Sequence, residues 1–187
     1  MKKLLATLLS AVLLLSLAAC AGTKTQETSN TVAPLDLLNT VWDNYAADEK
    51  FFAIGGDFSE ENTKENAPGT YTMEDADELD RVLGYPAAEI SKIEAAASLT
   101  HMMNANTFTA GAYQVKRGED IDALARQLET NILSRQWICG FPDKVLVAYV
   151  GGCLIGAFGA EELIDNFRTH LGECYSNVVI VSEAPVE

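Results

Sequence analysis

Two apolar segments, residues 144–150 and 153–158, constrain the fold of this chain more than any other part of the sequence. Gly151-Gly152 separates them, and a glycine pair between two β-prone segments is typical of a tight hairpin. Both segments are apolar at consecutive positions, so neither has a face suited to water. The pair therefore predicts two neighbouring strands near the centre of a covered sheet.

Two amphipathic helices are predicted, one on each side of this hairpin in the sequence. The first begins near the acidic residues Glu119 and Asp120 and ends near Arg135, charges that suit the helix dipole. The second covers residues 160–171, and Gly172 is expected to end it. Apolar residues recur at helical spacing in both: Ile121, Leu124, Ala125, Leu128 and Ile132, then Leu163, Ile164, Phe167 and Leu171.

The remaining predicted strands give the chain a repeated order of strands and helices. Residues 107–115 are rich in threonine and aromatics and predict a strand, and residues 177–181 predict a short one. Residues 87–104 fit a helix in their first half and a strand in their second, and the pattern does not decide between them. The order strand-strand-helix, repeated once and followed by a strand, predicts an α+β domain: an antiparallel sheet with helices packed on it.

The N-terminal half of this domain predicts two helices and a loop. Pro34 opens the first helix, whose apolar face carries Leu37, Leu38, Val41, Trp42 and Tyr45. Thr72 followed by Asp75 has the spacing of an N-terminal cap, and that second, short helix ends at Gly84. Residues 48–71 are expected to form a long irregular loop whose aromatic side chains tuck onto the core.

The first 20 residues have the order of a secretory signal. Lys2 and Lys3 precede an apolar run at 4–17 that is too short to span a bilayer. Leu17-Ala18-Ala19-Cys20 then resembles the lipobox of bacterial lipoproteins, in which the cysteine carries a diacylglyceryl lipid. The alternative is an ordinary signal peptide with an incidental cysteine.

Three segments follow from this interpretation. Residues 1–19 are the signal peptide, residues 20–32 are a flexible polar tether, and residues 33–187 are a single α+β domain. The predicted location is the extracytoplasmic face of the cell membrane, with Cys20 as the lipidation site.

The net negative charge of the chain makes some classes of binding partner unfavourable. Without Lys2 and Lys3, eleven basic residues face 27 acidic ones, which is a formal charge of −16. Such a surface repels phosphate backbones and anionic headgroups. Nucleic acid is therefore not an expected partner, and the lipid rather than a basic patch would hold the membrane.

Most of residues 33–175 resembles an uncharacterised family of small bacterial lipoproteins that contain a domain of unknown function. Three segments carry the resemblance: Asn131-Ile132-Leu133, Arg135-Gln136-Trp137-Ile138-Cys139-Gly140-Phe141-Pro142, and Phe158-Gly159-Ala160-Glu161-Glu162-Leu163-Ile164. Some similar sequences are labelled as bacteriocin transport accessory proteins. The resemblance implies a fold and a location but no activity.

Trp137-Ile138-Cys139-Gly140-Phe141-Pro142 is faintly similar to a thioredoxin active site. Redox exchange there requires a second thiol three positions after the first, and position 142 is proline. We therefore expect Trp137 to pack at the end of the preceding helix and Gly140 with Pro142 to form a turn. Cys139, Cys153 and Cys174 are expected to be small core residues, although two of them could pair.

Other candidate sites are weaker. The acidic run Asp75, Asp77, Glu78 and Asp80 is expected to be a solvated helix face rather than a cation site. Gly55-Gly56-Asp57 lacks the lysine and the serine or threonine of a phosphate loop. His101 and His170 are far apart in the sequence, and neither is followed four positions later by another histidine or an acidic residue. No cofactor or metal is therefore expected.

The sequence as a whole favours a binding or interaction module without catalytic activity. Its expected partner, besides the membrane, is a surface protein or a small ligand. The alternative is a redox or hydrolytic accessory factor for exported peptides. That alternative requires a pocket in which Cys139, His101 and a carboxylate converge with perturbed pKa values.

Overall fold

The computed structural model describes residues 31–138 and 140–186, so the predictions for the signal peptide and for Cys20 lie outside the described residues. The helices are α2 (Pro34–Asn44), α3 (Ala76–Leu83), the 3-10 helix η1 (Ala87–Lys92), α4 (Ile121–Leu133) and α5 (Glu161–Cys174). The strands are β1 (Ala53–Gly55), β2 (Lys64–Glu65), β3 (Gly69–Tyr71), β4 (Ile93–His101), β5 (Phe108–Val115), β6 (Lys144–Val150), β7 (Cys153–Gly159) and β8 (Val178–Pro185).

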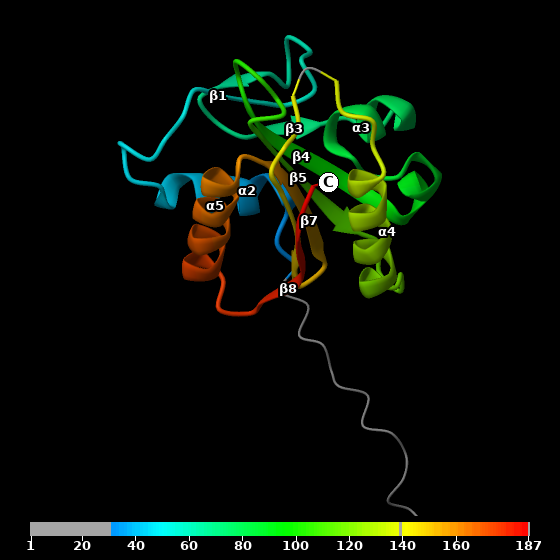
Figure 1. The fold of residues 1–187 in the computed structure, drawn as a ribbon. Helices are drawn as coiled ribbons and strands as arrows, with labels where there is room; N and C mark the ends of the chain where they lie inside the picture. The colour runs from blue at the N-terminus through cyan, green and yellow to red at the C-terminus, as the bar shows by residue number, and fades with distance from the viewer. Residues whose placement is uncertain (1–30, 139, 187) are drawn as a thin grey trace, which may run out of the picture.

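All the strand pairs are antiparallel, and the eight strands form one sheet in the order β2-β1-β4-β5-β7-β6-β8, with β3 also paired to β4. Helices pack on this sheet (Figure 1), so the predicted α+β class and the repeated strand-strand-helix order are confirmed. The Gly151-Gly152 hairpin joins β6 to β7, as expected. Every residue of β7 is buried.

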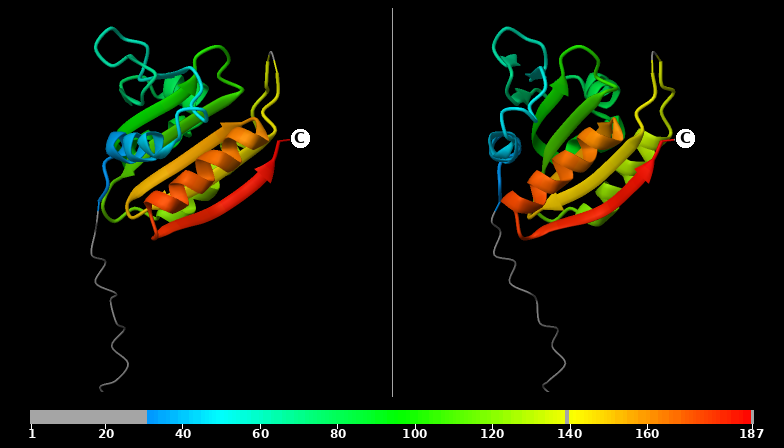
Figure 2. Two further views of the ribbon diagram at one scale, coloured as in Figure 1. Left: turned by 90° about the vertical axis from the view of Figure 1, so that its left-hand side faces the viewer. Right: turned by 60° about the vertical axis from the view of Figure 1, so that its left-hand side comes forward.

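The sheet separates two cores. Helices α2 and α5 cover one face, and α3 and α4 cover the other (Figures 1 and 2). Alternate residues of β7 serve the two sides, with Ile155 in the α2/α5 core and Leu154 in the α3/α4 core. This alternation explains why the hairpin sequence is apolar at consecutive positions.

One glycine in the sheet makes room for an aromatic ring. A Cβ at Gly111 would lie 2.1 Å from the hydroxyl oxygen of Tyr113, the next residue but one on the same face of β5. That hydroxyl donates a buried 3.0 Å hydrogen bond to the carbonyl of Leu83, the last residue of α3. Gly111 therefore helps to fasten α3 to the sheet.

The prediction of an irregular loop over residues 48–71 was wrong in part, because β1, β2 and β3 lie within it. These strands have two or three residues each, too few to show a period of two. Backbone pairing holds β1 and β3 to β4. Phe51 packs against the core as expected, but Phe52 is 70% exposed.

Three boundaries also differ from the predictions. The N-cap of α3 is Asp75, whose side chain accepts from the backbone N–H of Glu78, and not Thr72. Helix α5 continues through Gly172 to Cys174, where Cys174 and Tyr175 still pack on the α2/α5 core. The last strand extends to Pro185 rather than stopping at residue 181.

The undecided segment 87–104 contains both kinds of structure. Its first six residues form η1, and β4 follows from Ile93 to His101.

Candidate interaction surface

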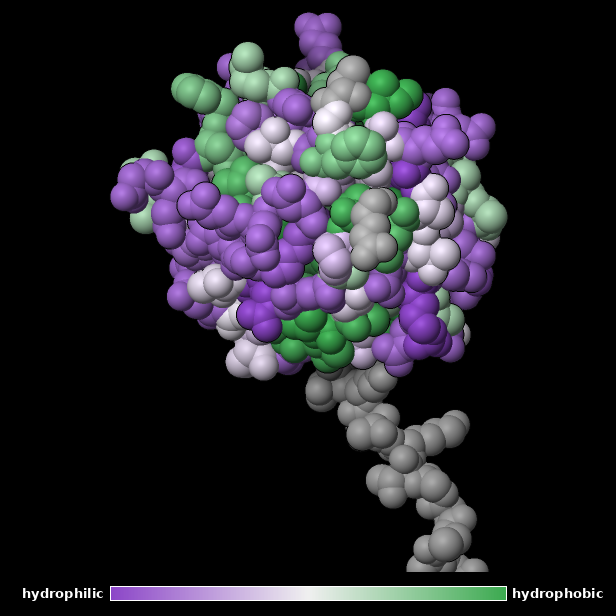
Figure 3. All heavy atoms as spheres, in the orientation of Figure 1, coloured by the Kyte–Doolittle hydropathy of each residue, from purple (hydrophilic) through white to green (hydrophobic). Residues whose placement is uncertain are grey.

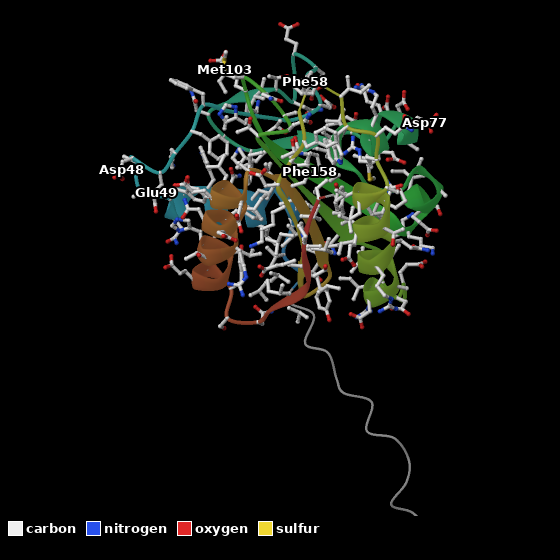
Figure 4. The ribbon with its side chains drawn as sticks, viewed as in Figure 1. Asp48, Glu49, Phe58, Asp77, Met103 and Phe158 are labelled. Atoms are coloured by element: carbon white, nitrogen blue, oxygen red, sulfur yellow. The ribbon has the colours of Figure 1, made fainter. Side chains whose placement is uncertain are left out.

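The large apolar side chains that are exposed lie mostly in loops at one end of the molecule. Six residues, here called the tip, form this group: Phe52 (70% exposed), Phe58 (55%), Met102 (41%), Met103 (78%), Ile138 (79%) and Phe141 (70%). The loops at 56–63 and 102–107 and the segments 134–138 and 140–143 rise at the same end in Figures 1 and 2. Figure 4 shows Met103 and Phe58 there.

Hydrogen bonds between loops hold parts of the tip in place. The Asn106 side-chain amide donates to the carbonyls of Ile138 (3.1 Å) and Gly140 (2.9 Å), which ties the β4–β5 loop to the α4–β6 loop. The backbone N–H of Met102 donates to the carbonyl of Phe52 at 2.8 Å. These bonds join segments that are far apart in the sequence, so the loops that carry the exposed side chains are connected to one another.

Phe58 is held in a conformation that an aromatic residue rarely adopts. Its φ of 62° lies in the left-handed region, where the Cβ of an L-residue crowds the following carbonyl oxygen. More than half of the side chain is exposed, so burial of the ring does not account for the conformation. Strain of this kind persists where the surrounding structure imposes it, and it is frequent at functional sites.

Asp57 organises the loop that presents Phe58. Its carboxylate accepts hydrogen bonds from the backbone N–H and hydroxyl of Ser59, from the Asn62 side chain and from the backbone N–H of Thr72. Partial burial alone would raise the pKa of Asp57, but these hydrogen bonds outweigh it and hold the pKa well below its usual range. The backbone of Gly56 is fastened in turn to the buried hydroxyl of Ser98.

The tip loops lie at the end of the molecule away from the start of the described chain, and acidic residues lie beside Phe58. The blue segment that begins the described chain is towards the lower end in Figures 1 and 2, and the tip loops are at the upper end. The loop that carries Phe58 also carries four acidic residues and one lysine: Asp57, Glu60, Glu61, Glu65 and Lys64. Exposed apolar side chains with acidic neighbours complement an apolar surface that carries basic groups.

Trp137, predicted to pack at the end of the preceding helix, does so. Its ring lies 5.0 Å from that of Phe158, and the Arg135 guanidinium lies over both rings, at 4.9 Å and 5.3 Å. Gly140, with a φ of 124°, is in the turn before β6. Cys139, the proposed redox residue, lies outside the described residues. The exposure of Ile138 and Phe141 on both sides of it was not predicted.

The two histidines occupy separate places. His101 ends β4, where its ring stacks on Phe51 at 5.4 Å. His170 is largely buried in α5 and stacks on Tyr45 at 4.2 Å, with Glu49 and Glu173 each 3.3 Å from one of its ring nitrogens. His170 thus links the end of α2 to α5.

The acidic run on α3 includes structural groups. Asp75 caps the helix, and Glu78 pairs with the exposed Arg81. Asp80, expected to be merely solvated, accepts from the Asn131 side chain on α4 and from the backbone N–H of Ala87. Within residues 31–138 and 140–186, no three histidine, cysteine or acidic side chains are placed to bind a metal ion together.

Two of the cysteines are described, and both are free thiols. Cys153 is fully buried, which confirms its expected place in the core, and burial raises its pKa to about 12. Cys174 is only partly buried. Burial and then the charge of Glu173 raise its pKa.

A shallow open groove of about 500 Å³ runs between η1 and α4. Part of its polar lining is engaged within the protein. The Thr130 hydroxyl donates to the carbonyl of Arg126, and the Asn131 amide donates to Asp80 and to the carbonyl of Gly84. The groove is open, and its Arg126 and Gln127 side chains are exposed rather than fixed in place, so the tip is the better candidate for binding.

Comparisons with protein-family models, with curated proteins and with solved structures found no match. In the described part of the chain, no helix is long and apolar enough to cross a membrane.

Proposed function

We propose that this protein is a membrane-anchored lipoprotein whose extracytoplasmic domain binds another surface protein through the tip. The observation that carries the proposal is the group of six exposed apolar side chains at the end away from the start of the described chain. Exposed apolar groups gathered in this way on an otherwise acidic surface are typical of protein interaction sites. Aromatic residues and methionine are enriched at such interfaces.

The anchor in this proposal is a diacylglyceryl lipid on Cys20, followed by a tether over residues 20–32. Thirteen residues extend to at most about 45 Å. The tether would leave from the end of the domain where the described chain begins, so the tip at the other end would stay accessible to other surface proteins. The partner is then a protein with an apolar pocket bordered by lysine or arginine, rather than the acidic headgroups of the membrane.

The anchor is tested by feeding cells a palmitate analogue and comparing the wild-type chain with Cys20→Ala. The expected result is a labelled protein in the membrane fraction, with both label and membrane association lost in the variant. A variant that keeps its label would refute lipidation at Cys20.

The tip is tested by placing a photo-cross-linking amino acid at Met103 in the full chain on intact cells. Asp122, exposed on α4, is the matched control position. We expect the same surface protein to be identified by mass spectrometry from Met103 and not from Asp122, and Phe58→Ala to reduce its yield. Equal capture from both positions, or a yield that Phe58→Ala leaves unchanged, would contradict the proposed binding surface.

A further inference from the structure

The seventh large apolar side chain that is exposed in the described structure does not belong to the tip. Val179, 42% exposed, lies on β8. β8 ends the sheet order and pairs only with β6, so the other backbone edge of this strand has no strand partner among the described residues. An open edge of this kind is able to pair with a further strand.

The two halves of β8 differ in how they are protected against such pairing. The second half contains Pro185 and Glu183, and Glu183 pairs with Lys144 and Arg168. The first half, Val178-Val179-Ile180-Val181, has no charge and no proline. Uncharged residues extend on both sides of it, from Cys174 to Ser182, in a chain with twice as many acidic as basic residues. Proteins usually place lysine, proline or another charged residue where an edge must stay single.

The uncharged half of β8 is complementary to itself. If two copies pair antiparallel about a two-fold axis at position 179, Val179 lies opposite Val179 of the other copy and Val178 lies opposite Ile180. Asn177 then lies opposite Val181 at the end of the ladder, so the centre of the pairing is apolar on both strands. Pairs of β-branched residues are favourable across strands, and no like charges face each other.

Other features of the structure agree with this register. A register shift in the β6–β8 pairing, between Val147 and Ala148, places a bulge at Val181, which would end a regular ladder there. In the view of Figure 3, which looks onto β8, a hydrophobic area lies towards the lower end of the molecule, where this strand begins. The tip is at the other end, so pairing through β8 would leave it free.

We propose that β8 is a self-association edge, and that two copies of this chain join their sheets by antiparallel pairing of residues 177–181. The interface is isologous, because the same segment of both copies supplies it. It does not depend on the tip or on what the tip binds.

The test uses two full-length copies that carry different epitope tags and are expressed in the same cells. One copy has a photo-cross-linking amino acid at position 179. The expected product carries both tags, and mass spectrometry joins position 179 to residues 176–183 of the other copy. The same amino acid at Met103 is the control, for which no product with both tags is expected.

Substitutions at position 179 separate strand pairing from a chance contact. With the cross-linker moved to Asn177, Val179→Lys in both copies is expected to lower the yield by at least about tenfold, which corresponds to about 1.4 kcal/mol. Val179→Thr keeps the branched side chain without charge and is expected to retain most of the product. Val179 is partly exposed, so neither change removes a fully buried group, and protease resistance checks the fold.

Three outcomes would overturn the proposal. One is the absence of any product with both tags from a folded chain. Another is a yield that Val179→Lys leaves unchanged. The third is a position 179 that links to a different protein and never to the second copy. None of these bears on capture at Met103, so the self-association edge and the tip can fail independently.

Discussion

Replacing Phe58 with alanine and with glycine should reveal the strain stored in the loop that presents it. Both changes remove the same ring, so the difference between them isolates the backbone. At an ordinary position alanine is more stable than glycine by about 0.4–1 kcal/mol, because glycine loses more freedom on folding. The φ of 62° at Phe58 adds a cost of roughly 1–2 kcal/mol for any residue with a Cβ.

The order of stability is therefore expected to reverse at this position. With the middle of each range, the strain exceeds the entropy term by about 0.8 kcal/mol, which is the expected net preference for Phe58→Gly over Phe58→Ala. Urea denaturation, with midpoints compared at equal slope, measures this difference. Phe52 is the matched control, since it is also an exposed aromatic but does not have positive φ, and alanine should be the more stable replacement there.

An alanine variant at position 58 that equals or exceeds the glycine variant in stability would refute the strain. Capture of the surface protein from Met103 should fall with both replacements, because both lack the ring.

Three further predictions concern the interior and the loop. Gly111→Ala should lower the free energy of unfolding by roughly 2–4 kcal/mol, because the new methyl group would displace the Tyr113 hydroxyl from the Leu83 carbonyl. Gly172→Ala, at an exposed position of α5, should raise the free energy of unfolding by up to about 1 kcal/mol in the same urea titrations. Because the pKa of Asp57 is lowered in the folded protein, its charged carboxylate stabilises the fold at any pH above its pKa in the unfolded chain, about 4, and this stabilisation is lost as the pH falls below that value. Asp57→Asn should therefore reduce the loss of stability that is measured between about pH 4 and pH 2. In an alkylation time course near neutral pH, Cys174 should react before Cys153. Cys153 should react only after unfolding, since burial raises its pKa to about 12. Prompt labelling of Cys153 in the folded chain would contradict its place in the core.

The regular part of the fold could be predicted because it is long and repetitive. The apolar hairpin at 144–158 and the stripe from Ile121 to Ile132 are shaped by burial, which leaves a period in the sequence. β1, β2 and β3 are held by backbone pairing to neighbours, which leaves no such period. The second half of β8 was missed for a related reason, since the charges of Glu183 and its partners hold it rather than apolar burial.

The tip could not be predicted from periodicity because its residues come from separate loops. Phe58 stands in a polar stretch and Ile138 and Phe141 flank Cys139, so each looked like a single apolar residue or part of a redox motif. Asn106 joins the β4–β5 loop to the α4–β6 loop through its side-chain amide, and nothing in the sequence marks its distant partners. The available signal was the position of large apolar residues inside otherwise polar loops.

The position of β8 also has a consequence for how the domain is completed. β6 is buried along most of its length, yet one of its two backbone edges is covered only by the strand that is last in chain order. Until residues 178–185 have been synthesised and have paired, the growing chain exposes β6 as an apolar strand with unpaired hydrogen-bonding groups. Such a strand is prone to pair with the wrong partner. A cleavage or frameshift that removed only β8 would leave both helical layers intact, but would make the buried strand β6 an open edge of the sheet that is able to pair with other chains.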